Sequence, residues 1–197
     1  MVTFSVPRRS SLHPLSFRVR PQSVAFAGSR NGTVSSRCAS ALVEGFSHLG
    51  FGFLTGCAPG IDRCFRSAFA SNKEVAERSI VACAFEDRAR RFTVGEIFAS
   101  VVVPAGLSPA AALHRRTVWV VRHCSLLVLV PQNPVTGGWG RGSRLAFTTA
   151  RHNFKPVFLV TANPPKPLAG ESVCRSNLFG VLDGYWVVPA GGTDAEE

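Results

Sequence analysis

The sequence predicts an α/β fold: a Rossmann-like, doubly wound and mostly parallel sheet with helices on both faces, in a single domain. Two observations lead to this prediction. Short apolar runs without alternating polarity recur along the chain, which is typical of strands buried on both faces of a parallel sheet. Helix-like segments separate these runs, as crossover connections between parallel strands require. The length of 197 residues is enough for one such domain.

The composition is that of a globular and strongly basic chain. Hydrophobic residues make up 46% and charged residues 17%, which excludes a disordered chain. No apolar run approaches the ~18 residues that a membrane span needs, so we expect a soluble, cytoplasmic protein with no membrane partner. The six cysteines show no CxxC spacing, so we expect reduced thiols and no metal site.

The net charge of +10 comes almost wholly from arginine. The planar arginine fork grips phosphate with two hydrogen bonds, so the charge favours a nucleic-acid or nucleotide partner. The alternative is a general arginine bias of a basic proteome or of GC-rich coding. Residues 1–22 are rich in arginine, serine and proline and contain no acid, so we expect a flexible basic arm there. A targeting segment is the alternative for this arm.

The first half of the chain alternates strand, turn and helix. We expect a first strand at 23–27, a turn at 28–33 and a helix from about 34 to 48 that Gly50 ends. The next elements are a strand at 51–55, a turn at 56–62, a helix to about 71 and a strand at 79–85. Beyond them the pattern weakens, and we expect a solvated, mixed-charge face at 86–91 and a short strand at 101–103.

The second half continues the alternation. We expect a helix at 108–123 with Pro109 in its first turn, a strand at 125–130, a glycine-rich turn at 131–143, a helix at 143–152 and a strand at 156–160. The Rossmann-like domain then spans 23–162. Residues 163–197 are interpreted as a C-terminal extension with an edge strand or hairpin arm at 184–189 and a frayed acidic tail.

Three turns, at 28–33, 55–62 and 131–143, follow strands of the sheet. Ligands of parallel sheets sit beyond the carboxyl ends of the strands, so all three turns open on one edge. Glycine allows the backbone to approach a ligand closely, and a helix N-terminus offers N–H groups to an anion. We therefore expect a phosphate or nucleotide pocket there. The alternative is a set of ordinary loops, since the glycine-rich turn matches neither the dinucleotide fingerprint nor the P-loop.

The candidate ligands are the glycines, hydroxyl groups and charged residues of these turns, with two arginines from the helix at 108–123. They are Gly28, Ser29, Arg30, Thr55, Gly56, Gly60, Asp62, Arg115, Arg116, Gly137, Gly138, Gly140, Gly142 and Ser143.

Several of these candidates have a structural alternative. We expect Asp62 to cap the following helix rather than contact a ribose or base, and Ser143 to cap its own helix. Adjacent helical residues point about 100° apart, so one of Arg115 and Arg116 faces the pocket and the sequence does not say which. Trp139 either stacks on a base or covers apolar surface.

With these turns in place, the chain resembles the Rossmann-like domain of the DNA-processing protein A (DprA/Smf) family. The resemblance covers about 23–161 and rests on four segments: 24–30, 54–62, His114-Arg115-Arg116 where the family has Arg-Asn-Arg, and 137–143. That family belongs to the SLOG nucleotide-binding superfamily, which includes the Lonely guy hydrolases. The resemblance implies binding of single-stranded DNA in DNA processing or recombination, and a homodimer as one assembly open to the chain.

The resemblance to the hydrolases is less complete. The Lonely guy enzymes carry PGGxGTxxE, whose glutamate acts on the glycosidic bond, and the stretch 137–143 lacks it. The sequence shows no Ser–His–Asp or Cys–His pattern, so we expect binding rather than catalysis and assign no catalytic residue and no cofactor. Two alternatives stay open: a module that senses or hydrolyses a small free nucleotide at its N-glycosidic bond, and a structural domain whose loops bind nothing.

Overall fold

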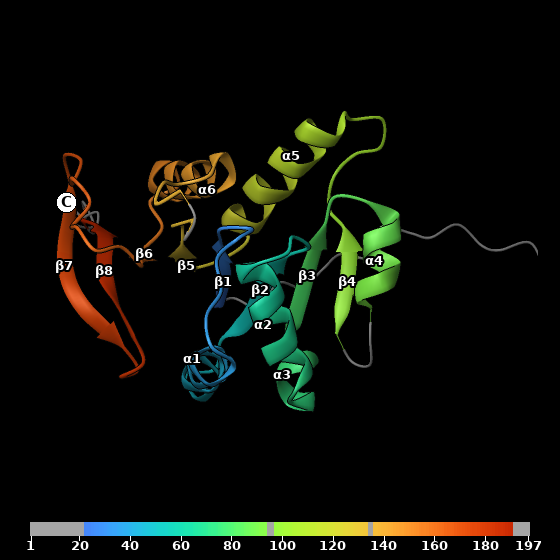
Figure 1. Ribbon diagram of the computed structural model, residues 1–197, viewed down its shortest axis with the longest axis horizontal. Helices are drawn as coiled ribbons and strands as arrows, with labels where there is room; N and C mark the ends of the chain where they lie inside the picture. Colours follow the sequence, from blue (N-terminus) through green and yellow to red (C-terminus); the bar gives the residue numbers. More distant parts are fainter. Residues whose placement is uncertain (1–21, 94–96, 134–135, 191–197) are drawn as a thin grey trace, which may run out of the picture.

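The computed structural model describes residues 22–93, 97–133 and 136–190 (Figure 1). The strands are β1 (Ser23–Gly28), β2 (Gly52–Gly56), β3 (Ser79–Cys83), β4 (Phe98–Val101), β5 (Leu126–Val130), β6 (Val157–Leu159), β7 (Glu171–Leu178) and β8 (Leu182–Pro189). The helices are α1 (Ser36–His48), α2 (Ile61–Ala70), α3 (Lys73–Ala76), α4 (Glu86–Phe92), α5 (Pro109–Arg122) and α6 (Arg141–His152).

All eight strands form one sheet in the order β4-β3-β2-β1-β5-β6-β8-β7. The first six strands are parallel, and β8 and β7 join as an antiparallel hairpin. The predicted Rossmann-like α/β fold is therefore confirmed. The strand order reverses between β1 and β5, which is where such sheets open a crevice.

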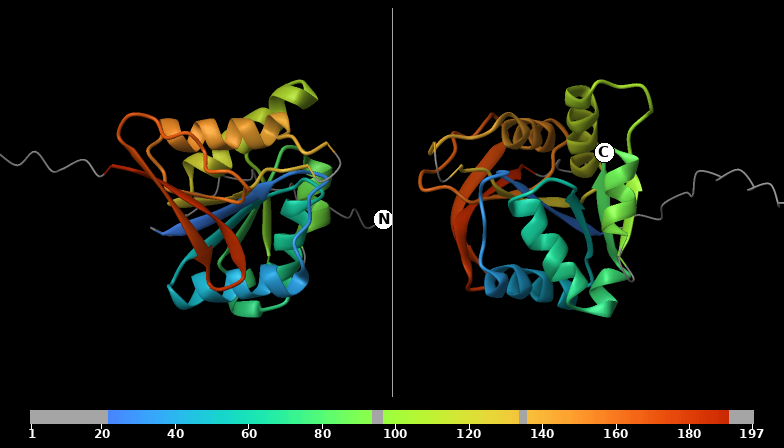
Figure 2. Two further views of the ribbon diagram at one scale, coloured as in Figure 1. Left: turned by 60° about the vertical axis from the view of Figure 1, so that its left-hand side comes forward. Right: turned by 45° about the vertical axis from the view of Figure 1, so that its right-hand side comes forward.

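The sheet carries a helical layer on each face (Figure 2). Helices α1 and α2 cover an aromatic half of the core, in which Phe26 stacks on Phe65 with ring centroids 3.9 Å apart. Helices α5 and α6 cover an aliphatic half that includes Leu127 and Leu129. Burial on both sides explains why the central strands read as continuous apolar runs.

The helix ends follow local rules. Ser35 caps α1 by accepting a hydrogen bond from Cys38 N, and Gly50 takes a φ of +80° just beyond its end. Ser108 caps α5 in the same way, with Pro109 in the first turn. The stop at Gly50 and the start at Ser108 and Pro109 were predicted from the same residues, whereas the cap at Ser35 was not.

The segment around residue 90 differs from the prediction. Residues 86–92 form the helix α4, where we expected only a charged surface, with Glu86 and Asp87 in its first turn and Arg90 and Arg91 in its last. This charge order complements the helix dipole and was a readable signal. The strand expected at 101–103 is β4 at 98–101, paired in parallel with β3.

The hairpin β7–β8 extends the sheet beyond β6, so the strand expected at 184–189 is its second arm. Arg151, near the end of α6, pairs with Glu171 at the start of β7, and its Nε donates to Glu171 Oε1 at 2.7 Å. The predicted N-terminal arm, apart from Gln22, and the acidic end at 191–197 lie outside the described residues. Within the described ranges, no helix is long and apolar enough to cross a membrane.

Candidate functional site

A cleft of about 800 Å³ lies beyond the carboxyl ends of β1 and β5, at the reversal of strand order. We call it the main cleft. Its walls come from the turn after β1, the start of α2, the first half of α5 and the start of α6. The lining residues are Ala27, Gly28, Ser29, Arg30, Asn31, Ala58, Asp62, Ala110, Leu113, His114, Arg116, Thr117, Asn133, Gly140, Arg141, Gly142, Ser143, Leu145 and Ala146.

The structure brings together eight of the fourteen candidate residues in the main cleft. These are Gly28, Ser29, Arg30, Asp62, Arg116, Gly140, Gly142 and Ser143. The other six do not line it: Thr55, Gly56, Gly60, Arg115, Gly137 and Gly138.

Two of the glycines allow close packing of backbone on backbone. Ser29 N donates to Val130 O at 2.9 Å, and Ser29 O accepts from Ile61 N at 3.1 Å, so the first turn lies between β5 and α2. A Cβ atom on Gly28 would lie 2.2 Å from Val130 O, and one on Gly60 would lie 2.3 Å from Ser29 O. We expected these glycines to make room for a ligand, whereas each makes room for a neighbouring carbonyl group.

The second turn, at 55–62, supports the main cleft through buried contacts. Thr55 is fully buried and its hydroxyl donates to Phe26 O at 2.9 Å, so this side chain has no exposed surface to offer a ligand. Arg66 Nη1 donates to both Gly56 O and Ala58 O at 2.8 Å and so holds the turn. A Cβ atom on Gly56 would lie 1.4 Å from Arg116 Nη1. Gly56 therefore provides the space that the Arg116 guanidinium occupies.

Asp62 and Arg116 form a buried ion pair at the floor of the main cleft. Arg116 Nη1 donates to Asp62 Oδ2 at 2.9 Å, and the two side chains are 8% and 6% exposed. The same carboxylate oxygen accepts from Ala58 N at 3.2 Å. The expectation that Asp62 caps α2 is wrong, because the N-cap position is Gly60 and Asp62 lies inside the first turn.

The structure also shows which of the two adjacent arginines, Arg115 or Arg116, lines the main cleft. Arg116 is buried and lines the main cleft, whereas Arg115 is exposed and does not line it. Arg116 Nε is buried and has no hydrogen-bond partner within the described part of the chain. A buried donor left unsatisfied costs about 1–3 kcal/mol, and more on a charged group. No contact among the described residues offsets this cost.

The start of α6 forms the opposite wall. Gly140 is its N-cap and supplies no side-chain hydrogen bond, so the first N–H groups of α6 receive no side-chain cap from this position. The helix begins at Arg141, two residues earlier than expected, so Ser143 is its third residue and not its cap. Helix N-termini of this kind suit anions because the N–H groups and the helix dipole both favour negative charge.

The lining is basic. Arg30, Arg141 and His114 lie on the walls, while Asp62 is the one acidic residue among those lining the main cleft and is already paired with Arg116. Arg141 and His114 were not among the predicted ligands. Arg141 could have been predicted, because it lies within the glycine-rich turn at 131–143 that we expected to face the ligand. His114 was noted only as the first residue of the stretch that stands where the DprA family has Arg-Asn-Arg.

Trp139 takes the second of its two expected roles. Its ring meets Phe147 edge to face at 5.5 Å, it packs on the aliphatic half of the core, and it is not among the lining residues. It covers apolar surface and does not reach the cleft.

A pair of buried cysteines lies near Arg116, one in the second turn and one at the end of β3. Cys57 follows β2, Cys83 ends β3, both are buried, and Arg88 Nη1 lies 3.7 Å from Cys57 Sγ. The hydrogen bond from Cys83 and the charge of Arg116 lower the pKa of Cys57, against the opposing effect of burial. The same hydrogen bond raises the pKa of Cys83. In the part of the chain that is described, no group of His, Cys, Asp and Glu could hold a metal ion.

Comparisons with known proteins identify the fold. No family model and no curated protein sequence matches the chain. The structure is similar to that of DNA processing protein A from Helicobacter pylori, which binds single-stranded DNA, with a TM-score of 0.54 and 17% identity over 73% of this chain and 66% of that one. It is similar to DprA from Streptococcus pneumoniae with a TM-score of 0.54 and 16% identity over 72% of this chain and 51% of that one.

The chain thus spans slightly under two thirds of the first protein and about half of the second. At these identities the likeness concerns the fold. It confirms, at that level, the resemblance to DprA that the turns of the sequence predicted.

Proposed function

We propose that this protein binds single-stranded DNA in DNA processing or recombination, and holds one backbone phosphate in the main cleft between Arg116 and the start of α6. The observation that carries this proposal is Arg116 Nε, a buried donor in the lining of the cleft without a partner in the described ranges. A phosphate oxygen is a strong acceptor for a guanidinium donor, and the N–H groups at the start of α6 suit the same anion.

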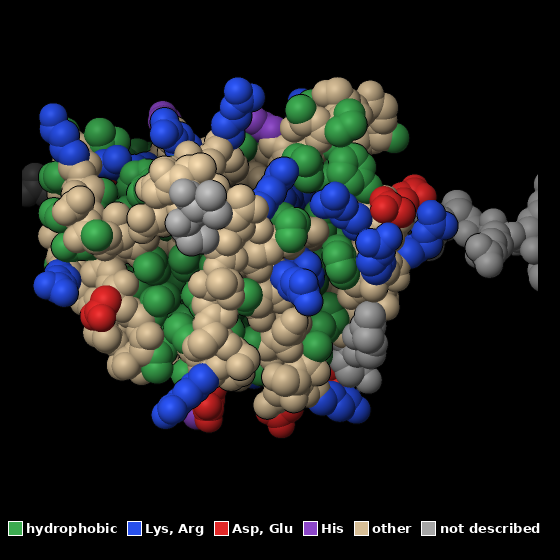
Figure 3. All heavy atoms as spheres, in the orientation of Figure 1, with side chains coloured by type: hydrophobic (Ala, Val, Ile, Leu, Met, Phe, Trp, Pro, Cys, Tyr) green, Lys and Arg blue, Asp and Glu red, His purple; other side chains and the backbone are tan. Residues whose placement is uncertain are grey.

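The surroundings support a polyanion. Arg30 and Arg141 are exposed at the cleft and are placed to attract neighbouring phosphates. On the face shown in Figure 3, Lys and Arg side chains stand both near the centre and around the edge, whereas Asp and Glu side chains stand near the edge. Asp62 is committed to Arg116, so it is a poor candidate for acting on a glycosidic bond, and binding is favoured over hydrolysis. The similarity in fold to a protein that binds single-stranded DNA points the same way.

A small free nucleotide is the second candidate ligand. A cleft of about 800 Å³ lies within the range of ~300–1,000 Å³ that is usual for small-molecule pockets. The two ligands differ in salt dependence, because each phosphate contact to a single strand contributes about −0.7 to the slope of log K against log salt. A mononucleotide held by one site responds weakly to salt.

The test measures the affinities for a twelve-residue oligo-dT and for dTMP at two salt concentrations. We examine Arg30→Ala and Arg116→Lys, where lysine keeps the charge but removes the Nε donor, with Arg115→Ala as the matched exposed control. Loss of a charge-assisted hydrogen bond predicts a weakening of about tenfold or more for both cleft variants and little change for the control. Circular dichroism melts verify that the variants are folded.

Unchanged oligo-dT affinity in both cleft variants would reject the main cleft as the site. Tight, salt-insensitive binding of dTMP without tighter binding of oligo-dT would favour the free nucleotide. Light scattering on the full chain tests the homodimer, which stays a prediction.

A further inference from the structure

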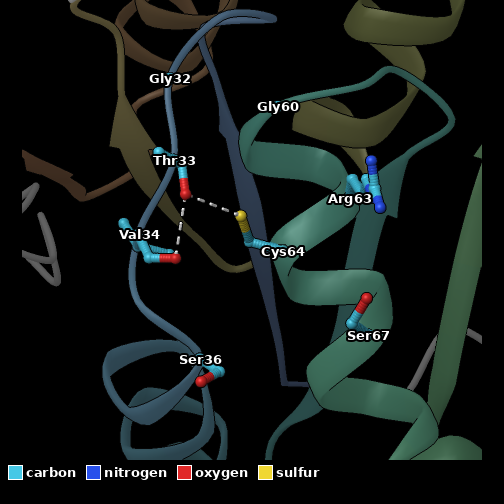
Figure 4. A pocket seen from close by; sticks show the side chains of 8 residues that line it. All are labelled: Gly32, Thr33, Val34, Ser36, Gly60, Arg63, Cys64 and Ser67. Carbon is cyan, nitrogen blue, oxygen red and sulfur yellow. Dashed lines mark hydrogen bonds between the residues drawn. The ribbon is translucent and has the colours of Figure 1, made fainter.

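A second hollow, of about 340 Å³, lies on the other side of the first turn. We call it the side pocket. Its lining residues are Gly32, Thr33, Val34, Ser36, Gly60, Arg63, Cys64 and Ser67. Figure 4 shows the segment 32–36 on one side and α2 on the other, with the Cys64 thiol pointing across the gap toward the Thr33 hydroxyl. These two groups are 3.7 Å apart.

One segment of backbone separates the side pocket from the main cleft. Arg30 and Asn31 line the main cleft, and Gly32 and Thr33 line the side pocket. Consecutive Cα atoms are about 3.8 Å apart, so the two hollows adjoin along this segment, which we call the ridge. The exposed Arg30 stands on that ridge. A mononucleotide bound in the main cleft would not extend past Arg30. A polynucleotide would continue along the ridge toward the side pocket.

The chemistry of the side pocket suits a second unit of the same ligand. Hydroxyl groups come from Thr33, Ser36 and Ser67, and the one charged lining residue is the basic Arg63. Ser36 is the first residue of α1, so the positive end of that helix dipole adds to the charge of Arg63. The lining contains no acid to repel a phosphate. Small side chains leave room for a sugar or part of a base.

We infer that the side pocket is a subsite for the nucleotide next to the one in the main cleft, so that the ligand is a single-stranded polynucleotide crossing the ridge at Arg30. Arg63 binds the phosphate of this second nucleotide, and the hydroxyl groups of the pocket meet its sugar. The inference rests on the proposed function, because it adds a second position to the same binding path. It predicts that the protein distinguishes a polymer from a mononucleotide by contacts and not only by charge.

The experiment compares two pocket variants with two matched controls on α1. Arg63→Ala removes the charge and Ser67→Phe fills the pocket. Arg37→Ala and Ser40→Phe make the same changes at exposed positions outside the lining. We expect both pocket variants to weaken binding of twelve-residue oligo-dT about tenfold while dTMP affinity stays within about twofold. Arg63→Ala should also make the salt slope less negative by about 0.7, the value of one phosphate contact.

Cys64 gives an independent readout. In a Cys38→Ser, Cys174→Ser background, Cys64 is the one remaining cysteine that is not buried. Its reaction with a disulfide reagent such as DTNB should slow when oligo-dT is bound and should be unaffected by dTMP at saturation. A thiol merely covered by general ordering of the fold would be protected by both ligands.

The outcomes separate this inference from the proposed function. If oligo-dT binding is lost in Arg116→Lys but unchanged in Arg63→Ala and Ser67→Phe, with no protection of Cys64, the subsite is rejected and the main cleft stands. If the pocket variants weaken dTMP as strongly as oligo-dT, the side pocket is not a second position and the inference is overturned. If Arg30→Ala and Arg116→Lys both leave oligo-dT binding unchanged, the main cleft is rejected and the proposed function fails with it.

Discussion

Arg116 in the main cleft and Arg151 beside the hairpin are both largely buried, at 8% and 13% exposure, and each pairs with a carboxylate. Arg151 donates through Nε and Nη2 to both oxygens of Glu171, and its Nη2 also donates to Lys166 O at 3.1 Å. Arg116 donates through Nη1 to one oxygen of Asp62, while its Nε has no partner in the described ranges.

The difference separates a structural ion pair from one prepared for a ligand. Removing a charged group from water costs several kcal/mol, and the cost is recovered only when its hydrogen bonds are made. At the hairpin the protein itself supplies the acceptors, so the pair joins α6 to β7. At the main cleft one buried donor of a lining residue is left without a partner in the described ranges. Four predictions follow from this contrast, from the largest expected effect to the smallest.

Arg116→Ala should destabilise the protein most, by about 3–5 kcal/mol, because it leaves Asp62 buried and unpaired. Urea unfolding of the variant measures this change. Arg115→Ala, at the exposed neighbouring position, is the control and should change the free energy of unfolding by less than about 0.5 kcal/mol. A similarly small effect at Arg116 would mean that the pair is not the buried support described above.

Gly56→Ala should cost about 1–3 kcal/mol, because the added methyl group would occupy the place of the Arg116 guanidinium and force it to move. Gly142→Ala is the control, since a Cβ atom there meets nothing within 4 Å. Inside α6 that alanine should be neutral or stabilising by up to about 1 kcal/mol. Thermal unfolding of the two variants compares them, and equal melting temperatures would contradict the tight fit at Gly56.

Glu171→Gln should cost about 1 kcal/mol at pH 7 and leave ligand affinity unchanged. The hydrogen bond from Arg151 lowers the pKa of Glu171. Its stabilising contribution is therefore complete above the pKa of an unfolded glutamate, about 4.3, and is lost as the pH falls through the lower folded pKa. Urea unfolding at pH 7 and pH 3 should show a smaller difference from the unsubstituted protein at pH 3. An equal difference at both values would show that the charge is not what stabilises the hairpin.

The smallest expected effect is at the cysteines near Arg116. Absorbance at 240 nm should show one thiolate forming below the pKa of an ordinary thiol, about 8.5, in the folded protein and none below it in Cys57→Ser. Cys83→Ala should raise that pKa by removing the hydrogen bond, whereas Cys124→Ala should not change it. The absence of any thiolate forming below about pH 8.5 would disprove the lowered pKa.

Local patterns were sufficient for most elements. The apolar runs placed the six parallel strands with errors of a few residues, and Ser108, Pro109 and Gly50 marked helix ends by effects confined to one turn. The helix α4 was missed although its charge order was visible, because its seven residues are too few for a clear apolar period. The early start of α6 was missed because glycines in its first turn suggested a loop.

The sequence by itself determined the alternation of strands and helices, and with it the edge of the sheet where the three turns open, because apolar periodicity and glycine placement act within a few residues. The tertiary structure decided that Arg116 and not Arg115 enters the main cleft, that Asp62 pairs with it across 54 residues, and that Gly56 makes room for the guanidinium. These outcomes depend on the rotation and position of α5 over the sheet. Packing sets both, and no nearby residue encodes them.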